Sequence, residues 1–509
     1  MIVSLPTYFR QLMRLKKQIS FLFILTLTVF AIFIFSCRKP VNVSDDPSIK
    51  LSFSNDSVIF DTVFTSLGST TRRLMVYNTS NNRVKISNLK LASGNNSAFR
   101  LNVDGESGST FSEIEINGGD SIYIFTRVTI DPNDINNPFV VEDEINFLTN
   151  GNDQSVKLVA WGQNANYILA DTYIAGFPPF KIVADSLATT TWTSEKPYVV
   201  YGYAVIDSYG KLEIMDGTRV HFHENSGLWA YVDGVLKVYG TRENPVYFGG
   251  DRLEQDYQDL PGQWDRIWLM EGRQGEDHEI YNAVIENGFI GLQAESFLRA
   301  TENRVILNNV VIQNMQGIGV FSRLFNITGE NLLAANCGGY CMAFTGGGNY
   351  SFKHTTIANY WFYSVRNTPS VFINNYLLDS TETPIPYGIN FKLENSIAYG
   401  SNRNEFEADM VGEADSIYYF DHCLLKTEID VTNSTNFNEV LANQDPLFVD
   451  YQVNDYRIDT LSPAIDIGDP AIASTVPFDL LGNSRTPDPD LGAYEFVPGQ
   501  GGGEFRWKR

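Results

Sequence analysis

Four short stretches of the chain share one pattern: Asn282-Ala-Val-Ile285-Glu-Asn287, Asn309-Val-Val-Ile312-Gln-Asn314, Asn331-Leu-Leu-Ala334-Ala-Asn336 and His354-Thr-Thr-Ile357-Ala-Asn359. The copies follow one another at steps of 27, 22 and 23 residues. Weaker copies are Asn395-Ser-Ile397 and His422-Cys-Leu424. Short β-type runs at such a period, without the period of a helix, predict a coiled β-solenoid.

Stacking of the coils explains why the pattern repeats. One coil cannot bury its own inward side chains, whereas coils stacked about 4.8 Å apart pair their backbones and share a continuous core. The expected interior column contains Ile285, Ile312, Ala334, Ile357 and Ile397. An asparagine ladder at a turn is expected from Asn287, Asn314, Asn336 and Asn359. A leucine-rich repeat would require a Leu spacing and a helical return, and a propeller would require longer four-stranded blades.

The repeats begin before these copies. Two Gly-Thr pairs, at Gly217 and Gly240, lie 23 residues apart, and Phe248-Gly-Gly-Asp251 leads through a loop to Ile267-Trp268-Leu269. This rung-and-loop pattern resembles the right-handed parallel β-helix proteins of the pectin-lyase-like superfamily, over roughly residues 166–497. The resemblance implies an all-β chain with a parallel β-helix at 166–460.

The end of the chain carries the most specific resemblance. The stretches Asp445-Pro-Leu-Phe448, Ser462-Pro-Ala-Ile-Asp-Ile-Gly468 and Asp490-Leu-Gly-Ala-Tyr-Glu495 resemble the C-terminal cap of bacterial surface proteins with this fold. The resemblance implies a cap at 461–497, and a disordered tail is expected at 498–509. A cap protects the last coil, which is otherwise an exposed sheet edge. We expect the acids of the cap to form a structural network around Arg485 rather than a site.

The N-terminus has the features of an export signal. Arg10, Arg14, Lys16 and Lys17 precede an apolar run that ends at Ser36-Cys37. The small residue before Cys37 resembles a bacterial lipobox, which implies removal of residues 1–36 and lipid attachment to Cys37. A single transmembrane anchor and an ordinary signal peptide are the alternatives. Residues 37–47 are polar and predict a flexible tether. This pattern predicts an outer-membrane lipoprotein of a Gram-negative-type bacterium, facing the periplasm or the cell surface.

Residues 48–163 predict a β-sandwich. Seven runs alternate apolar and polar residues, and turn sequences such as Gly118-Gly-Asp120 separate them. The runs are 57–64, 73–77, 84–91, 99–103, 121–129, 144–148 and 156–161. The stretch Phe60-Asp-Thr-Val-Phe64 followed by Met75-Val-Tyr-Asn78 resembles the hydin-type immunoglobulin-like domain. This resemblance implies a spacer or docking role.

Composition excludes some functions. The net charge of −23, from 37 basic and 60 acidic residues, argues against nucleic acid as a partner, because phosphate binding requires a positive face. Four cysteines in 509 residues do not make a disulfide scaffold. Cys337 and Cys341 lie in one coil, as a disulfide or as buried free thiols.

Catalytic motifs of the superfamily are absent from the repeat region. Its hydrolases resemble one another in Asn-Thr-Asp, Asp-Asp and Gly-His-Gly motifs, and none of these occurs within residues 166–460. Its lyases need a Lys or Arg base beside calcium-binding acids, and the sequence shows no matching group. A non-catalytic binder is therefore favoured. The alternative is a polysaccharide lyase or glycoside hydrolase with an unrecognised site, and only the similarity of the fold supports it.

Two groups of residues are weak metal candidates. His221 and His223 flank Phe222 on a predicted strand, so both imidazoles should point outward together. Exposed surface histidines are favoured over a metal pair, because no third ligand follows from the sequence. Calcium could sit in the loop that contains Asp251, Glu254, Asp256 and Asp259, although a solvated acidic loop is favoured.

Aromatic residues suggest what the protein binds. Trp229 and Tyr231 alternate with apolar neighbours, and Trp268 has the same relation to Ile267 and Leu269. If the apolar neighbours are core, the rings face solvent on adjacent coils, where they can stack on sugar rings. The alternative is that a loop, such as residues 249–262, covers them. The predicted partners are therefore the membrane, through the lipid, and a polysaccharide or envelope protein.

Overall fold

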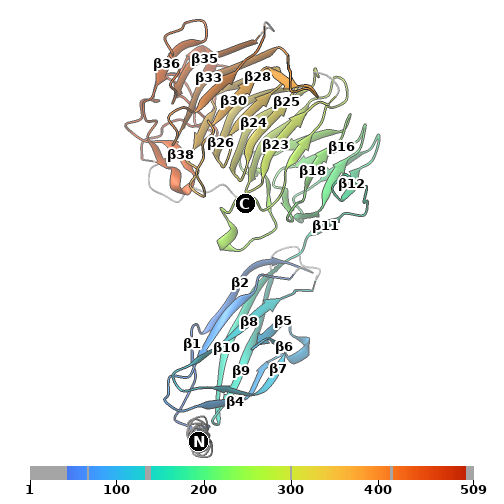
Figure 1. The fold of residues 1–509 in the computed structure, drawn as a ribbon, viewed down its shortest axis with the longest axis vertical. Coiled ribbons are helices and arrows are strands. Elements are labelled where there is room, and N and C mark those ends of the chain that lie inside the picture. The colour runs from blue at the N-terminus through green and yellow to red at the C-terminus, as the bar shows by residue number, and fades with distance from the viewer. Residues whose placement is uncertain (1–42, 66–67, 132–138, 298–300, 413–415, 500–509) are drawn as a thin grey trace, which may run out of the picture. The chain divides into compact units, whose positions relative to one another are not determined.

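The computed structural model describes residues 43–65, 68–131, 139–297, 301–412 and 416–499, and its fold is all-β. Contacts divide the chain into two compact units (Figure 1). The first contains residues 1–59, 70–128 and 142–159, and the second contains residues 60–69, 129–141 and 160–509. Cys37 and the export signal lie outside the described residues. Within the described ranges, no helix is long and apolar enough to cross a membrane.

The N-terminal region is an antiparallel β-sandwich, as predicted. One five-stranded sheet has the order β1-β3-β8-β5-β6 and the other has the order β2-β10-β9-β4-β7. The strands are β1 (Ser52–Phe53), β2 (Ser57–Phe64), β3 (Arg72–Tyr77), β4 (Val84–Leu91), β5 (Phe99–Val103), β6 (Glu106–Gly108), β7 (Thr110–Ile116), β8 (Ser121–Val128), β9 (Phe139–Thr149) and β10 (Asn152–Gln163). Inward residues such as Leu74, Val76 and Ile124 are fully buried, which is the alternation that the sequence showed. The alternation did not predict β7, because only Ile116 of this strand is buried.

The flexible tether predicted at residues 37–47 is too long. From Val43 onward the chain is fixed to the sandwich, because Val43 bridges to Arg83 and the Ser44 N–H donates to the Arg83 carbonyl at 2.8 Å. The Asn150 and Asn152 side chains also donate to backbone carbonyls of residues 46 and 47. Polar composition suggested a loose segment, but these backbone groups find partners on the folded domain.

The second unit is a parallel β-helix, as predicted. The strands of its coils form three faces, and on each face a strand pairs in parallel with the strand of the next coil. The first face contains β13 (Thr189–Trp192), β16 (Lys211–Met215), β19 (Val235–Tyr239) and β28 (Gly348–Lys353). The second face contains β11 (Asn166–Leu169), β14 (Tyr198–Tyr201), β17 (Arg219–Phe222), β20 (Val246–Gly250) and β29 (Thr356–Asn359).

Longer strands bend from the first face to the second. They are β22 (His278–Glu286), β24 (Arg304–Met315), β26 (Asn326–Cys337), β33 (Ile389–Gly400), β35 (Ser416–Leu425) and β36 (Phe437–Ala442). The third face is a separate sheet of β12 (Phe180–Ala184), β15 (Tyr203–Ile206), β18 (Gly227–Ala230), β21 (Ile267–Leu269), β23 (Ile290–Glu295), β25 (Ile318–Arg323), β27 (Met342–Thr345), β30 (Val371–Asn374) and β34 (Phe406–Asp409). Figure 1 shows these strands stacked in chain order.

The predicted interior column exists, with one error. Ile285 pairs with Ile312, Ile312 with Ala334, and Ala334 with Ile357, and all four are fully buried. The next member is Ala398 rather than Ile397, which pairs with Thr356 and faces outward. Each core residue lies three positions after the residue that opens its repeat, and Ala398 has this relation to Asn395.

Two side-chain ladders run along the turns. In the predicted ladder, Asn287, Asn314 and Asn336 have positive φ angles, and the Asn336 amide donates to Asn314 Oδ1 at 2.8 Å. The residues that open the repeats form a second ladder that was not predicted. Their φ angles lie between 45° and 54°, and the Asn331 amide donates to Asn309 Oδ1 at 2.9 Å. These residues turn the long strands from the first face to the second, a conformation that Asn tolerates. They are Asn282, Asn309, Asn331, His354, Asn395 and His422.

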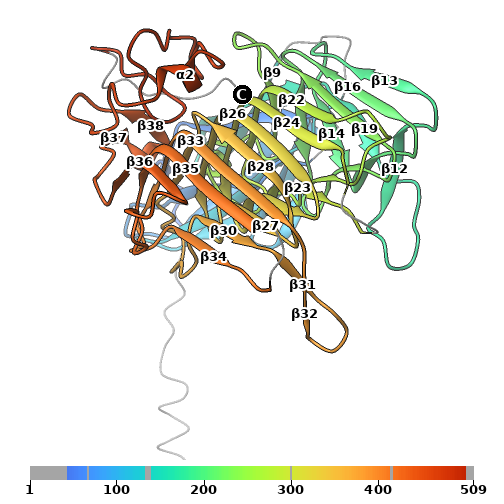
Figure 2. The ribbon, with the colours of Figure 1, turned by 90° about the horizontal axis from the view of Figure 1, so that it is seen from above.

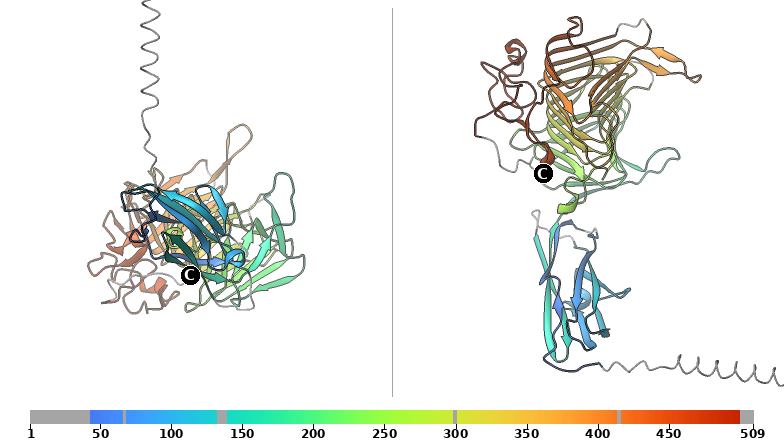
Figure 3. Two further views of the ribbon diagram at one scale, coloured as in Figure 1. Left: turned by 90° about the horizontal axis from the view of Figure 1, so that it is seen from below. Right: turned by 60° about the vertical axis from the view of Figure 1, so that its left-hand side comes forward.

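The closing segment, residues 461–497, does not sit on the last coil as the predicted cap would. It lies along the outside of the second face and crosses several coils, as α2 (Pro470–Ala473) and its neighbours show in Figures 2 and 3. Its contacts include Ala493 N–H to Thr356 Oγ1 at 2.9 Å and Asp469 N–H to Asn395 Oδ1 at 2.8 Å. Two hairpins complete the unit, made by β31 (Tyr376–Leu378) with β32 (Pro384–Pro386) and by β37 (Phe448–Asp450) with β38 (Asp455–Ile458).

The predicted structural network around Arg485 is present. The guanidinium is fully buried, pairs with the Glu495 carboxylate, and donates to Asn331 Oδ1 at 2.8 Å. The Asp479 carboxylate accepts from backbone N–H groups within the same segment. Cys337, Cys341 and Cys423 are buried free thiols.

Candidate functional site

The outward side chains of the third face form the candidate site. Trp229 on β18 pairs with Trp268 on β21, and Trp268 pairs with Gln293 on β23, so these residues lie on three adjacent coils. Their neighbours in the strands, such as Leu228 and Ile267, are buried in the core. The predicted placement of the two tryptophans on adjacent coils is therefore confirmed.

The prediction that the Trp229 ring faces solvent is wrong. Trp229 points outward, but only 4% of its surface is exposed. The Phe177 ring lies parallel to it at a centroid distance of 6.0 Å, and the Trp268 ring stacks against it at 4.7 Å. The loop that covers it therefore precedes β12, and it is not the loop at residues 249–262. Phe177 itself is half exposed.

Trp268 and two further aromatic rings remain accessible. Trp268 is partly exposed, Tyr231 is 39% exposed and Phe297 is 51% exposed. Tyr231 meets the Trp229 ring edge-on at 5.4 Å, and Phe297 meets the Trp268 ring edge-on at 6.3 Å. Trp268 Nε1 is buried and has no hydrogen-bond partner among the described residues. The result is a small aromatic platform fixed by contacts at its edges.

A row of polar side chains continues the third face next to this platform. The Arg266 guanidinium donates to Gln293 Oε1, and Gln293 Nε2 donates to Glu295 Oε1 at 2.8 Å. The Glu295 carboxylate then pairs with Arg323 at 2.7 Å, and the Arg323 guanidinium lies 4.9 Å above the Phe297 ring. Because every member bonds to the next, the row is held in one geometry. We name Arg266, Gln293, Glu295 and Arg323 the polar row.

The polar row continues on its other side to Tyr203. The Tyr203 hydroxyl donates to the Asp265 carboxylate, which also pairs with Arg266 at 2.8 Å. Burial raises the pKa of Tyr203, and the neighbouring Asp265 charge raises it further, so the phenol is neutral and serves as a donor. The aromatic platform offers an apolar surface, and the exposed ends of the two arginines offer donors at its margin. Such a combination suits a ring with one apolar face and hydroxyls at its rim.

The two histidines do not act as the predicted surface pair. Both point outward, but His221 is buried and His223 is not. His221 Nδ1 lies 2.9 Å from the Gly250 carbonyl, which can only accept, so Nδ1 carries the proton. Burial lowers the pKa of His221 to about 4, which keeps the ring neutral. His223 Nδ1 is 2.8 Å from the Asp251 carboxylate, and this hydrogen bond raises the pKa of His223.

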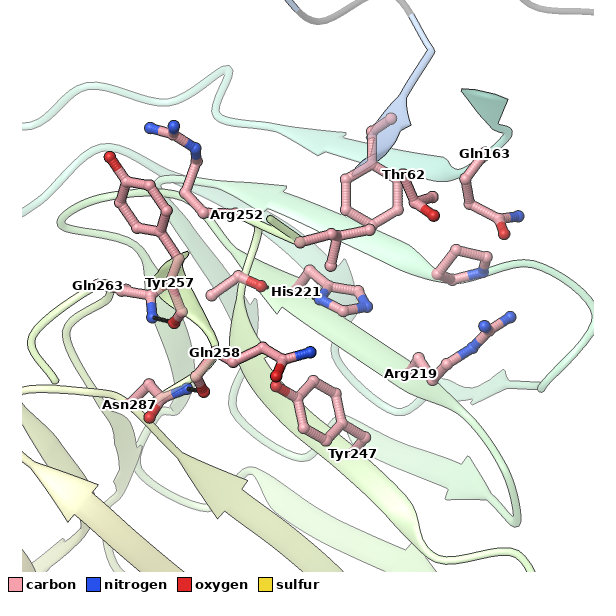
Figure 4. A pocket seen from close by; sticks show the side chains of 14 residues that line it. Thr62, Gln163, Arg219, His221, Tyr247, Arg252, Tyr257, Gln258, Gln263 and Asn287 are labelled. Carbon is pink, nitrogen blue, oxygen red and sulfur yellow. Dashed lines mark hydrogen bonds between the residues drawn. The ribbon is translucent and has the colours of Figure 1, made fainter. Parts of the chain in front are cut away.

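Arg219, Tyr247, Gln258 and Asn287 of the β-helix lie around His221 (Figure 4). Arg219 pairs with Tyr247 on the neighbouring strand, the Tyr247 ring centroid lies 5.4 Å from that of His221, and Gln258 comes from the loop after β20. The Tyr247 hydroxyl donates to Glu286 at 3.0 Å. Two buried oxygens near His221, Gln263 Oε1 and Asn287 Oδ1, accept no hydrogen bond among the described residues.

The acidic loop is tied to basic neighbours. Asp251 bonds to His223, and the Glu254 carboxylate accepts two hydrogen bonds from Arg252 at 3.2 Å. Asp256 belongs to a short 3₁₀ turn, η2 (Gln255–Tyr257). Among the described residues, no group of three or more His, Cys, Asp or Glu side chains is placed to hold a metal ion.

Comparisons with known proteins give no family for the chain. No family model and no curated protein matches it. Three solved structures with local similarity are a PapD-like domain of human CEP192 (12% identity, 26% of this chain, 95% of that chain, TM-score 0.17), a family 123 glycoside hydrolase from Clostridium perfringens (7%, 23%, 30%, 0.17) and the VesB protease of Vibrio cholerae (12%, 22%, 31%, 0.15). Likenesses this weak say nothing about function.

Sequence reasoning found the aromatic residues but missed the polar row. The stretch Ile290-Gly-Leu-Gln-Ala-Glu295 alternates apolar residues with Gln293 and Glu295, which is a strand with a polar outer face. Alignment of Leu292 with Ile267 would have placed Gln293 beside Trp268.

Proposed function

We propose that the protein is a non-catalytic, lipid-anchored protein of the bacterial cell envelope that binds glycan on the third face of its β-helix. The observation that carries the proposal is the Trp268 platform next to the polar row. A flat indole can stack on the C–H face of a sugar, and the fixed arginines can donate to hydroxyls at the rim of that sugar. Because the polar row is already ordered, ligand binding would lose little conformational entropy there.

Retention on polysaccharide tests the binding proposal. The full chain, purified in detergent, is applied to a panel of insoluble polysaccharides, and both retention and soluble product are measured. We expect retention without product, and at least a tenfold loss of affinity for Trp268→Ala. Tyr123→Ala is the matched control, because Tyr123 is also exposed but belongs to the sandwich. Equal retention of wild type and Trp268→Ala would contradict glycan binding at Trp268. Release of soluble product would contradict a non-catalytic function and indicate an enzyme.

The lipid anchor rests on the sequence before Cys37 and is tested separately. In cells that express the full chain, Cys37→Ala should abolish incorporation of a radiolabelled fatty acid and should leave residues 1–36 on the chain. Mass spectrometry of the N-terminal peptide should show a diacylglyceryl group on Cys37 in the wild type. An unmodified Cys37 in a membrane-bound protein would contradict the lipid anchor without affecting the glycan-binding proposal.

A further inference from the structure

A polar groove lies on the outer surface of the first face of the β-helix. Its volume is about 440 Å³, within the range that suits small-molecule ligands. It crosses four consecutive strands, β24, β26, β28 and β33. None of the residues that line it belongs to the aromatic platform or the polar row on the third face.

The strand register arranges the side chains of the groove in two columns. One column contains residues from the first two positions of their strands, namely Arg304, Asn326, Asn349 and Asn390. The other contains Thr328, Ser351 and Lys392, which pair with one another on successive coils. Thr328 and Ser351 are small, so the second column forms the floor of the groove. The same amide and hydroxyl groups therefore recur at the coil spacing of about 4.8 Å, which is comparable with the length of one sugar unit.

The first column is built rather than loose. Asn326 is buried, and its amide donates to the Thr301 carbonyl at 2.7 Å. Asn326 Oδ1 accepts from both the backbone N–H and the side-chain amide of Asn349, at 2.9 and 3.0 Å. This arrangement turns Asn349 Oδ1 outward as an acceptor, and Asn390 is exposed one coil further on. An incoming hydroxyl would meet both donors and acceptors in fixed positions.

Charge decides which ligand fits. The two cations at the groove are already neutralised, Arg304 by Asp277 and Lys392 by Glu394, each at 2.8 Å. Glu302 adds a negative charge, and the whole chain carries −23. An anionic ligand would therefore gain little and would be repelled at long range. Amides and hydroxyls match a neutral polyol, whose groups both donate and accept.

We infer that this groove is a second saccharide-binding site, specific for a neutral glycan chain that lies across the coils of the first face. The inference does not depend on the third-face site, because the two sites share no residue. A chain with both sites would hold one long polysaccharide at two points, which raises the apparent affinity through effective concentration.

Titration calorimetry of the full chain tests this inference. The probes are the neutral hexasaccharides of β-1,4-linked xylose, β-1,4-linked glucose and α-1,4-linked glucose, with hexagalacturonate as the anionic probe. Ser351→Tyr fills the floor of the groove, and Ile417→Tyr is the control, because Ile417 pairs with Asn390 one coil beyond the groove and is 56% exposed. Asn390→Ala is a second variant that changes only an exposed side chain.

The expected result is binding of a neutral hexasaccharide that Ser351→Tyr and Asn390→Ala weaken at least tenfold, while Ile417→Tyr leaves it unchanged. Trp268→Ala should leave binding of the hexasaccharide to this groove unchanged. A failure of the groove inference can therefore be told apart from a failure of the third-face proposal. Binding of hexagalacturonate alone, no binding of any neutral probe, or unchanged binding in both groove variants would each overturn the inference.

Discussion

The second and third faces of the β-helix both carry large apolar side chains that point away from the core. The two sets of side chains differ in how much of their surface is buried. On the second face, Val284, Val311 and Leu333 are buried, because they pack with Leu480 and Ala493 of the closing segment. On the third face, Trp268 stays partly exposed beside the polar row, and none of the segments that the structure describes buries it in this way. The comparison teaches that the direction of a side chain on a coil does not set its exposure. A distant segment of the chain decides which face is free to bind.

The largest expected effect is loss of the closing segment. A chain truncated after residue 459 would expose Val284, Val311, Leu333 and their neighbours as one apolar strip. Burial of each such side chain is worth roughly 1.5–3 kcal/mol, so we expect an insoluble or dye-binding protein rather than a folded one. Soluble yield and binding of a hydrophobic dye are the measurements. A truncated chain with the wild-type melting temperature would show that the second face needs no cover.

A point variant sharpens the same comparison within the closing segment. Leu480 is 2% exposed against the second face, whereas Leu461 of the same segment is 80% exposed. Leu480→Ala should lower the free energy of unfolding by about 2–4 kcal/mol, and Leu461→Ala should leave it nearly unchanged. Urea unfolding of both variants measures the difference. Equal effects would place Leu480 outside the packed interface.

The two stacked tryptophans of the third face should separate stability from binding. Trp229→Ala removes a buried ring and should cost about 3–5 kcal/mol of unfolding free energy. Trp268→Ala should cost less stability but abolish most of the glycan retention. Thermal unfolding and polysaccharide retention are measured on both variants. The reverse pattern, with Trp229→Ala folded and unable to bind, would mean that the Phe177 loop opens to admit ligand.

Acid should weaken the β-helix through its buried histidines. Burial lowers the pKa of His278 to about 4, and its Nδ1 accepts the Leu236 N–H at 3.1 Å. An unfolded histidine has a pKa of about 6.5, so the folded state resists protonation. The contribution of neutral His278 to the free energy of unfolding is therefore fully present above pH 6.5. As the pH falls toward 4, this contribution decreases by up to roughly 3 kcal/mol.

The urea midpoint measured between pH 7 and pH 4.5 checks this expectation. His278→Gln keeps a polar side chain that cannot titrate, so its midpoint should fall less steeply with acid than that of the wild type. His221, whose pKa burial also lowers to about 4, should leave part of the slope in place. Identical pH slopes in the wild type and His278→Gln would contradict a buried neutral His278.

The smallest expected effect lies at the corner between the second and third faces. Asn336→Ala removes the donor to Asn314 Oδ1 and leaves that buried acceptor unsatisfied, which should cost about 1–2 kcal/mol. Asn349→Ala, which removes an exposed link of the first face, should cost less. Chemical denaturation measures both variants. No cost at Asn336 would mean that the ladder contributes nothing to the stacking of coils.

Much of the fold could be predicted from the sequence because the signals are local. The alternation of residues fixed β2, β4 and β5 at their observed bounds, and the repeat placed Ile285, Ile312 and Ile357 in one column. Ile397 was misplaced because its copy of the repeat is too short to show that the core position falls on Ala398. A longer alignment from Asn395 would have corrected this error.

The candidate site was predicted only in part, since exposure is a tertiary property. The alternation of apolar residues showed that Trp229 points outward. The loop that carries Phe177 lies about fifty residues upstream, and its sequence does not indicate that it packs on Trp229. The closing segment has the same character, because it looks like a cap and instead lies along the side of the second face. Its one signal was the run of apolar residues on both sides of β22, β24 and β26, which indicates strands buried on two faces.

Hydroxyl-radical footprinting of the full chain, with and without a saturating polysaccharide from the retention panel, tests the third-face site most directly. The labelling rate of each aromatic side chain reports its exposure. We predict that Trp268, Tyr231 and Phe297 lose reactivity on binding, while the exposed Tyr123 of the sandwich keeps its rate. Unchanged labelling of Trp268 and Phe297 in the saturated protein would contradict the account.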